Sequence, residues 1–466
     1  MRRFFLLLAV LLALLIPVES FAGPFMVLPK RGSAWSKTWL TGWDYRKEFT
    51  ATRESGAVTD YQVRLQIGSY VISSCEDTTG WSAPTSTLAT DTGHEGTNAI
   101  TITSTSDDGY AYLSFSESDW REARNIVFWH KRSGTAETTG EVYIFDANND
   151  YVSWNFSMSD DWTEQVIDTT STPDSSSGTM DWDRIVKMRF DANAEGTVLY
   201  VDYIQRNAVD CEGHCLSTFN DLRFTNSDGD LLSYYIESIS GTTPNQIATV
   251  WVKLDYVGTS ATKFYMYYGN SGASAASNGT NTFHYYNDFE SDTIGNAPSG
   301  FVSNTNLVVY ADTVHGSQAI HDTATTNNVF DMDDIQNMRV IGKIRQYATT
   351  TNNRGRINVR VGGSEINVGE ITNNSINIYE GANQRDAAAF TWGTNWHSFD
   401  IRIEGTTIHA KFDSTEIDYS SLSGSTAGKC GIQTWVENSQ FAFDAIAVGK
   451  YSFTEPVVGS WGSEES

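Results

Sequence analysis

The sequence predicts an all-β protein of three jelly-roll-like β-sandwich modules, with the second module inserted in the first. Short runs of alternating apolar and polar residues recur along the chain, as in Tyr61–Ile67, and a period of two is typical of half-buried strands. Clusters of Gly, Asn, Asp and Ser separate these runs, and the chain holds 37 glycines. Almost no helical periodicity follows residue 22, so stacked sheets account for the pattern better than helices do.

The first 22 residues have the pattern of a secretory signal peptide. Arg2 and Arg3 precede an apolar run over Phe4–Val18, and a small residue, Ala22, stands at the expected cleavage position. No later stretch approaches the roughly 20 apolar residues of a membrane-spanning helix. We therefore expect a secreted or cell-surface protein with no membrane insertion after the signal is removed.

The net charge limits the partners that the chain can bind. The formal charge is −26 at pH 7, and an acidic surface repels nucleic-acid phosphates and anionic lipids. Nucleic acid is therefore not an expected partner. The acidity is explained most simply as a solubility device, and the alternatives are binding of divalent cations or a saline habitat.

Four motifs in a fixed order mark the first module. W-x-Y-R-K stands at Trp43–Lys47 and, after a long gap, D-L-R-F-x-x-x-D-G at Asp221–Gly229, V-W-V-K at Val250–Lys253 and Y-Y-G-N at Tyr267–Asn270. Together the motifs resemble an uncharacterised β-domain family of secreted prokaryotic surface proteins, which has no assigned activity. The gap then implies an insertion, and the split first module is expected over residues 36–74 plus 208–283.

The inserted segment, residues 75–207, resembles a galactose-binding-like jelly roll. The matching features are Glu76–Trp81 at its start, Ile126–Lys131 in its middle and Leu199–Ile204 at its end. This resemblance rests on pattern and placement, and it implies a sandwich with its own hydrophobic core.

The chain after residue 283 resembles a laminin-G or concanavalin-like sandwich, which we expect over residues 284–453. The resemblance rests on an acidic opening phrase at Asn287–Asp292, a hairpin beginning at Phe399–Gly405 and a final strand at Phe441–Val448. The polar residues 454–466 are predicted to be a flexible tail.

The four cysteines allow more than one pairing. Cys75 stands where the insertion begins, and Cys211 and Cys215 stand where it ends. We expect a disulfide from Cys75 to Cys211 or Cys215 across the neck of the insertion, because export permits oxidation. Cys211 could instead pair with Cys215, or bind metal together with His214, although a structural zinc site wants four ligands. Cys430 occupies an apolar strand position and is expected to be a buried free thiol.

Two acid pairs are candidate ligands for a structural Ca²⁺ ion. Each sandwich begins on an acidic phrase and ends on an aspartate in its last strand, which pairs Glu76 with Asp202 and Glu290 with Asp444. The first and last strands of a jelly roll are neighbours, and carboxylates with backbone carbonyls suit calcium. The resemblance implies calcium too, because many galactose-binding-like modules hold a structural ion there. Exposed carboxylates, or carboxylates bonded to loop amides, are the alternative.

Tryptophans of the insertion are candidate sugar platforms, because an aromatic face stacks on a pyranose ring. Trp154 alternates with Val152 and Phe156 and is predicted to be core. Trp120 follows a polar loop and Trp129 stands beside His130 and Lys131, so these two are the predicted ligand-binding residues. For both, packing in the core is the alternative.

The function expected from these features is non-catalytic binding of a glycan or polysaccharide, for adhesion or attachment. A polysaccharide-degrading enzyme with an unrecognised site is one alternative, and a structural subunit of a surface layer or filament is another. Glu416–Tyr419 resembles the paired carboxylates of laminarinase-type glycosidases, but Ser420, Ser421 and Leu422 follow where a third carboxylate is needed. We therefore predict no catalytic residues.

Overall fold

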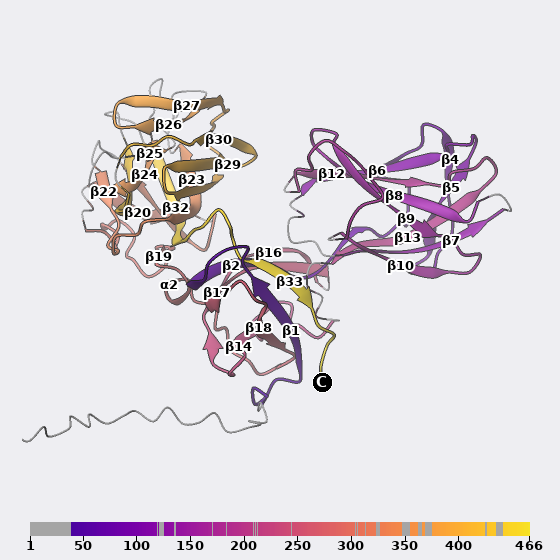
Figure 1. Ribbon diagram of the computed structural model, residues 1–466, viewed down its shortest axis with the longest axis horizontal. Helices are drawn as coiled ribbons and strands as arrows, with labels where there is room; N and C mark the ends of the chain where they lie inside the picture. The colour runs from indigo at the N-terminus through magenta and orange to yellow at the C-terminus, as the bar shows by residue number, and fades with distance from the viewer. Residues whose placement is uncertain are drawn as a thin grey trace, which may run out of the picture. The chain divides into compact units, whose positions relative to one another are not determined.

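The computed structural model describes residues 39–466, except for residues 119, 121–124, 135–136, 170, 183, 208, 210, 212, 244, 303, 305, 313, 323–326, 347–354, 362–365, 369–374, 425 and 435–440. The predicted signal peptide, residues 1–22, lies outside the described residues. In the described part the fold is all-β, as predicted, with antiparallel sheets and one short helix, α2 (Gly279–Thr282) (Figure 1). No helix within these ranges combines the length and apolar character needed to span a membrane.

A five-stranded sheet contains strands from both ends of the described chain, in the order β15-β14-β18-β1-β33. Its strands are β1 (Tyr45–Thr52), β14 (Arg223–Asn226), β15 (Leu231–Leu232), β18 (Thr262–Tyr268) and β33 (Val457–Trp461). Strands β1 and β18 each carry one of the predicted motifs and pair directly, with Tyr45 opposite Tyr268.

Strand β33 corrects one prediction. It pairs antiparallel with β1, placing Trp461 opposite Phe49, and the yellow strand lies beside the indigo one in Figure 1. Beyond the strand, Arg46 is ion-paired with Glu465 at 2.6 Å. The prediction of a flexible tail over residues 454–466 is therefore wrong, because this segment completes the sheet of the first module.

An eight-stranded sheet joins the first module to the insertion, with the main order β10-β7-β13-β2-β17-β16, β5 beside β13 and β4 beside β5. Its strands are β2 (Val58–Ser73), β4 (Ser86–Thr92), β5 (Asn98–Ser104), β7 (Asn125–Ser133), β10 (Thr163–Asp168), β13 (Val198–Asn207), β16 (Tyr234–Thr242) and β17 (Asn245–Val257).

Strand β2 crosses from the first module into the insertion without a break. Its first part pairs with β17 as far as Gly68 opposite Ile247, and from Ser69 onward it pairs with β13. Gly68 has φ +112°, and a Cβ atom there would lie 2.1 Å from the carbonyl oxygen of Gln246. Only glycine fits this crossing point.

The second sheet of the inserted sandwich has six strands in the order β11-β9-β8-β12-β6-β3. They are β3 (Trp81–Ser82), β6 (Tyr110–Ser118), β8 (Thr139–Asp146), β9 (Tyr151–Ser157), β11 (Ser175–Ser177) and β12 (Ile185–Asp191). Buried apolar residues from both sheets, including Phe128 of β7 and Phe190 of β12, form one core cluster between them.

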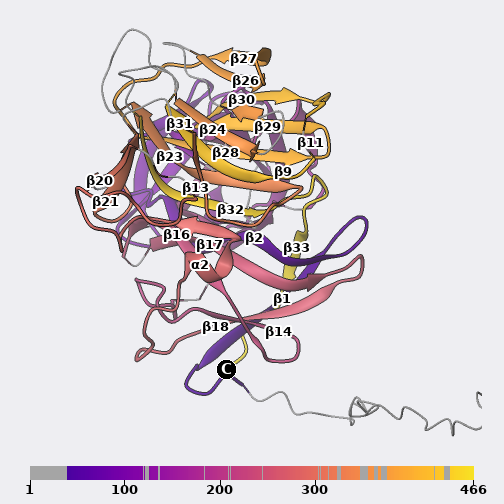
Figure 2. The same cartoon turned by 90° about the vertical axis from the view of Figure 1, so that its left-hand side faces the viewer.

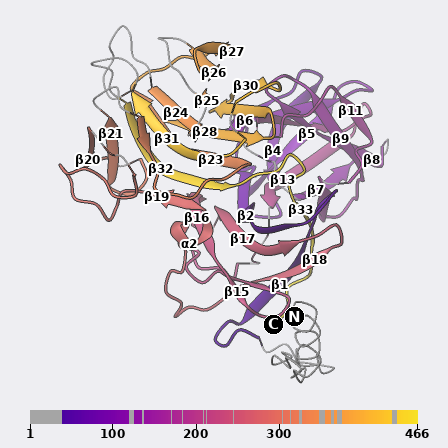
Figure 3. The same ribbon diagram turned by 60° about the vertical axis from the view of Figure 1, so that its left-hand side comes forward.

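The C-terminal sandwich also has two sheets, which Figures 2 and 3 show from two sides. One has the main order β20-β21-β32-β23-β28-β29-β30, with β19 beside β32, and the other the order β22-β31-β24-β25-β26-β27. The first contains β19 (Tyr285–Asn287), β20 (Leu307–Ala311), β21 (Gln318–Asp322), β23 (Met338–Gln346), β28 (His397–Glu404), β29 (Thr407–Phe412), β30 (Thr415–Tyr419) and β32 (Phe441–Lys450). The second contains β22 (Asn327–Val329), β24 (Gly355–Val361), β25 (Ile366–Val368), β26 (Ser375–Glu380), β27 (Asn383–Ala389) and β31 (Lys429–Thr434).

The buried apolar residues fall into three large clusters. One draws on β1, β2 and β14–β18 with Val458, a second on strands of the insertion, and a third on the C-terminal sandwich. The predicted domain boundaries stay predictions, but each cluster gives one sandwich its own core.

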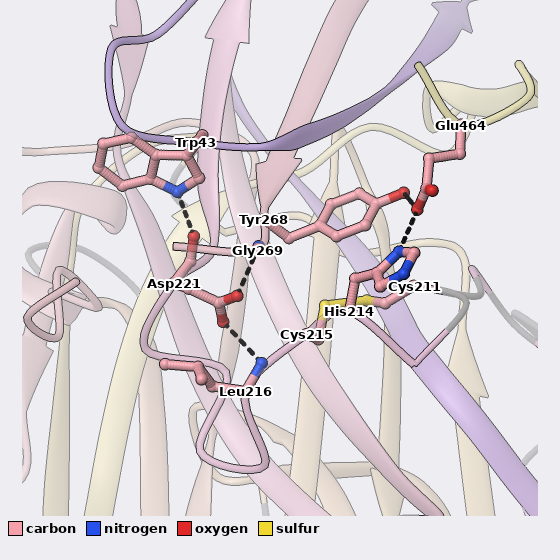
Figure 4. The surroundings of a disulfide bond; sticks show 9 residues. All are labelled: Trp43, Cys211, His214, Cys215, Leu216, Asp221, Tyr268, Gly269 and Glu464. Carbon is pink, nitrogen blue, oxygen red and sulfur yellow. Dashed lines mark hydrogen bonds and ion pairs between the residues drawn. A yellow bond between two sulfur atoms is a disulfide. The ribbon is translucent and has the colours of Figure 1, made fainter. Parts of the chain in front are cut away.

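Three of the four motifs of the first module meet at Asp221, which is fully buried (Figure 4). Its carboxylate accepts hydrogen bonds from the backbone N–H groups of Leu216 at 3.1 Å and Gly269 at 2.8 Å. The indole of Trp43 donates to the Asp221 carbonyl oxygen at 2.5 Å. Asp221 therefore holds together loops that are far apart in the sequence.

The disulfide joins Cys211 to Cys215 (Figure 4). Cys75 is a free, buried cysteine. The predicted disulfide from Cys75 to Cys211 or Cys215 is wrong because Cys75 and Cys211 belong to different hydrophobic cores. Cys75 lies in the core of the insertion, whereas Cys211 lies in that of the first module. Cys430 is a buried free thiol, as predicted.

Candidate functional site

The outer surface of the six-stranded sheet carries aromatic and charged side chains that we name the tyrosine face. Along β6, β8 and β12 the inward residues, among them Leu113, Ile144 and Met188, are buried in the core. Successive side chains of a strand point to opposite sides of the sheet, so their neighbours lie on the outer side. The tyrosine face consists of Tyr110, Tyr112, Glu141, Tyr143, Phe145, Tyr151, Ser153, Lys187, Arg189 and Asp191.

The strand register brings these residues together in rows. Arg189 of β12 lies opposite Tyr112 of β6 on one side and opposite Tyr143 of β8 on the other. In the next row, Phe145 lies opposite Tyr151. Directly opposite residues on one side of a sheet have their side chains in contact range, so the rows form a continuous surface.

Two cations lie between the rings. The Cζ atom of Arg189 is 3.8 Å from the ring centroid of Tyr110 and 4.6 Å from that of Tyr143. The Nζ atom of Lys187 is 4.8 Å from the ring centroid of Tyr112 and 4.4 Å from that of Phe145. Such cation–π contacts hold both cations and rings in fixed positions.

Two carboxylates, the buried Asp191 and the partly exposed Glu141, fix the polar groups of the tyrosine face. Arg189 donates two hydrogen bonds to Asp191, at 2.6 and 2.5 Å, and the Asp191 side chain is only 3% exposed. Burial raises the pKa of Asp191 to about 6, although Arg189 opposes this shift. Glu141 accepts hydrogen bonds from the Tyr143 hydroxyl at 2.9 Å and from Ser153 at 2.6 Å. Burial, followed by the hydrogen bond to Glu141, raises the pKa of Tyr143.

This arrangement has the chemistry of a sugar-binding surface. The tyrosines of the tyrosine face are partly exposed. Sugar rings present apolar C–H surfaces that stack on aromatic faces, and hydroxyl groups that bond to fixed polar groups at the edge. The tyrosine face offers both within one sheet.

Trp120 does not form the predicted platform. Its side chain is 2% exposed in the core of the insertion, and its ring stacks on Phe115 with the centroids 5.6 Å apart. The prediction for Trp120 is wrong, because the residue after the polar loop turns inward. Trp154 is core, as predicted.

Trp129 lies on the outer side of the other sheet of the insertion and is half-buried. The ring of His94 stacks on it with the centroids 3.7 Å apart. Beside it, the Nζ atom of Lys131 lies over the rings of Trp162, at 4.9 Å, and Tyr200, at 4.3 Å. His94 covers one side of the indole, and Trp129 stays a prediction as a ligand-binding residue.

Both members of the predicted acid pair, Glu76 and Asp202, accept hydrogen bonds from backbone N–H groups of residues 94–98. Glu76 accepts hydrogen bonds from the backbone N–H groups of Thr97 at 2.8 Å and Asn98 at 3.1 Å. Asp202 accepts from the N–H groups of His94 at 2.7 Å and Glu95 at 2.8 Å, both through Oδ2. The other oxygen, Oδ1, is buried without a hydrogen-bond partner.

In the acid pair Glu290 and Asp444, the glutamate is bonded as Glu76 is, whereas Asp444 accepts from the N–H of Ala445 at 2.6 Å. Glu290 accepts from the backbone N–H groups of Ser317 and Gln318, both at 2.7 Å. Oδ2 of Asp444 is buried without a partner, and burial, with the charge of Glu290, raises the pKa of Asp444 to about 8.

Both acid pairs fit a cation, because each leaves a buried carboxylate oxygen without a donor. Among the described residues no group of three or more His, Cys, Asp or Glu side chains could hold a metal ion. An ion at either pair would therefore need backbone carbonyl groups or water to complete its shell of six to eight oxygens.

One family model matches part of the chain. Residues 218–298 match a domain of unknown function, DUF2341. The match begins just before the D-L-R-F motif and runs past the predicted boundary at residue 283 and beyond β19. No curated protein matches the chain.

Solved structures of carbohydrate-binding modules are similar to about a third of the chain. A family 11 module from Clostridium thermocellum, in complex with a β-1,3-1,4-mixed-linked tetrasaccharide, is 20% identical over 31% of this chain and 98% of that chain, with a TM-score of 0.27. The module CBM66 from Bacillus subtilis is 12% identical over 31% and 96%, with a TM-score of 0.26. An agarase is 11% identical over 33% and 26%, with a TM-score of 0.25. At these identities and TM-scores the similarities assign no ligand or activity to this chain.

Proposed function

We propose that this is an exported, non-catalytic protein that binds carbohydrate through the tyrosine face of its inserted sandwich. The observation that carries the proposal is the convergence of five aromatic rings and two cations on one outer sheet surface, fixed by Glu141 and Asp191. Export is supported by the signal-like pattern of residues 1–22.

Tyr112 and Tyr151 are the residues that test the site. They come from β6 and β9, strands on either side of the β8–β12 pair, and both rings are partly exposed. A ligand that spans the tyrosine face would contact both. Burying one aromatic side chain contributes roughly 1.5–3 kcal/mol, so each loss should weaken binding at least about tenfold.

The experiment is a glycan-array screen of the full-length protein, followed by isothermal titration calorimetry with the best polysaccharide. Tyr112→Ala and Tyr151→Ala should each weaken binding, whereas Tyr256→Ala should not, because Tyr256 is 50% exposed on β17 outside the insertion. Unchanged affinity in both tyrosine-face variants, with loss of binding in Trp129→Ala, would move the site to the other sheet. Release of soluble sugar from the bound polysaccharide would contradict the proposal that the protein is non-catalytic.

We also propose that each sandwich holds one structural Ca²⁺ ion, with Glu76 and Asp202 as ligands in the insertion and Glu290 and Asp444 in the C-terminal sandwich. The unpartnered oxygens of the two aspartates support this. A bound ion would neutralise the buried carboxylates and tie the beginning of each sandwich to its last strand.

A further inference from the structure

A cavity of about 360 Å³ lies where the first module meets the C-terminal sandwich. Its lining includes Tyr235 of β16 and Trp251 of β17 on one side, and Lys343 of β23 on the other. Figure 2 shows β16 and β17 next to β32. A neighbouring cavity of about 330 Å³ shares the side chains of Arg64 and Arg339 with it.

The walls of the cavity are held by direct contacts between the two modules. The guanidinium of Arg339 lies 4.9 Å from the ring centroid of Trp251, whose indole N–H donates to Glu237 at 2.7 Å. Trp251 and Tyr235 also belong to a buried apolar cluster with Phe283 and Ala447. The cavity is thus preformed by packed side chains, as small-ligand sites generally are.

The charge of the lining is opposite in sign to that of the whole chain. The chain has a formal charge of −26, but five cationic side chains line the two cavities against four carboxylates. The cations are Arg64, Arg339, Lys343, Arg402 and Lys411, and the carboxylates are Glu237, Asp400, Asp413 and Glu455.

Among these cations, Lys343 is held by a hydroxyl group, although its charge also lowers the pKa of the nearby Asp413, after the hydrogen bonds that Asp413 accepts. Asp400 is shared by Arg339, at 2.6 Å, and Arg402, at 2.7 Å. Lys343 donates to the Ser398 hydroxyl at 2.7 Å, and no described carboxylate is ion-paired with it. The carboxylate of Asp413 is instead bonded to His397 and to the N–H of Ser398. Lys343 is therefore a cation in a preformed cavity whose hydrogen bond goes to a neutral hydroxyl, while the nearby Asp413 bonds to other groups.

We propose that this cavity binds a single anionic sugar residue of a glycan, with Lys343 contacting its carboxylate or sulfate group. A ligand that carries one negative charge and several hydroxyl groups matches the lining, because hydroxyl groups can donate to Glu237 and Asp413 while a bare anion would be repelled by them. The volume lies at the small end of ligand pockets, which suits one sugar ring. This site is separate from the tyrosine face and does not depend on it.

The test is isothermal titration calorimetry of the full-length protein at low salt. The ligands are glucuronic acid and N-acetylglucosamine 6-sulfate, with glucose, N-acetylglucosamine and sodium sulfate as comparisons. One of the two acidic sugars should bind about tenfold or more tightly than its neutral parent, because a hydrogen bond to a charged group is among the stronger ones. Which of them binds identifies the anionic group.

Lys343→Gln should weaken that binding about tenfold. Lys263→Gln is the matched control, because Lys263 is 55% exposed on β18 and paired with Glu48 away from the cavity. Tyr112→Ala and Tyr151→Ala should leave this affinity unchanged, which separates this site from the tyrosine face. Equal binding of the neutral sugars, an unaffected Lys343→Gln variant, sulfate binding as tightly as the sugars, or no binding of either acidic sugar would each overturn the proposal.

Discussion

Glu76 and Glu290 occupy equivalent positions in two different sandwiches. Each carboxylate accepts hydrogen bonds from two consecutive backbone N–H groups, at residues 97–98 and 317–318. The backbone carbonyl of Glu76 accepts a hydrogen bond from the side-chain amide of Asn98, and that of Glu290 accepts one from Gln318, at 3.0 Å in both cases. Asp202 and Asp444, the aspartates paired with these glutamates, each have one buried carboxylate oxygen without a hydrogen-bond partner.

Calcium should stabilise both sandwiches. In differential scanning calorimetry, chelator should lower the melting temperature and added Ca²⁺ should restore it. The gain follows RT ln(1 + [L]/Kd), about 2.7 kcal/mol at a hundredfold excess over Kd. Asp202→Asn and Asp444→Asn should each remove part of the response. Asp107→Asn should not, because Asp107 is an exposed residue of the insertion. A melting curve that ignores both chelator and calcium would contradict the calcium proposal.

Asp221→Asn should destabilise the first module. The substitution keeps the shape of the side chain but leaves one acceptor oxygen where the carboxylate has two, so the N–H of Leu216 or of Gly269 loses its partner. A buried group without its hydrogen bond costs roughly 1–3 kcal/mol. Urea denaturation measures the loss. Asp44→Asn, at an exposed position, is the control, and an equal midpoint for the two variants would show that Asp221 has no special role.

His130 should make the protein less stable in mild acid. It is 0% exposed, neither ring nitrogen has a hydrogen-bond partner, and burial lowers its pKa to about 4. The unfolded histidine has a pKa of about 6.5, so between these values the unfolded state binds more protons and stability falls as pH falls. The full effect is about 3 kcal/mol.

His130→Leu should flatten the pH dependence of stability between about pH 6.5 and 4. Denaturant unfolding at a series of pH values measures it. His409→Leu should give no such flattening, because the His409 side chain is 40% exposed and paired with Asp418. If the wild-type and His130→Leu profiles run parallel through this window, then His130 is not the group responsible.

Removal of strand β33 should expose the edge of β1. A chain ending at Phe453 loses the strand and the contacts of Arg46 and Arg53 with residues 454–466. Unpaired strand edges promote association, so this variant should be less stable and should aggregate on heating. A chain ending at Gly462 keeps β33 and lacks Glu465. Equal melting temperatures of the two truncated chains would assign the stabilisation to the contacts of Glu464 and Glu465 instead of the strand.

The fold class could be predicted from local patterns, because alternation is a property of neighbouring residues. Trp154 was placed correctly in the core on its alternation with Val152 and Phe156. Strand β33 was missed because its partner β1 lies about four hundred residues away in the sequence, and no local signal reports such a pairing. The cysteine pairing failed for a related reason, since burial in separate cores is a tertiary property.

The candidate site was missed although its signal is visible in the sequence. In Tyr110–Leu113 and Glu141–Phe145 the outward positions carry Tyr, Glu and Phe, while the inward positions carry Ala, Leu, Val and Ile. Solvent-facing strand positions usually carry small or charged residues, so repeated aromatic residues there indicate a binding surface. The sequence favours Trp120 instead because it follows a polar loop, and only the structure shows that its side chain is buried.

The continuity of β2 has a mechanical consequence. Both covalent connections between the first module and the insertion run as strands of one sheet, since β2 enters it and β13 leaves it, and Val209 N–H then donates to the Gln66 carbonyl at 3.1 Å. A polysaccharide pulling on the tyrosine face would load these strands along their length, so many ladder hydrogen bonds would share the force in shear. A flexible tether would stretch under that load, whereas this junction resists it until the sheet itself ruptures.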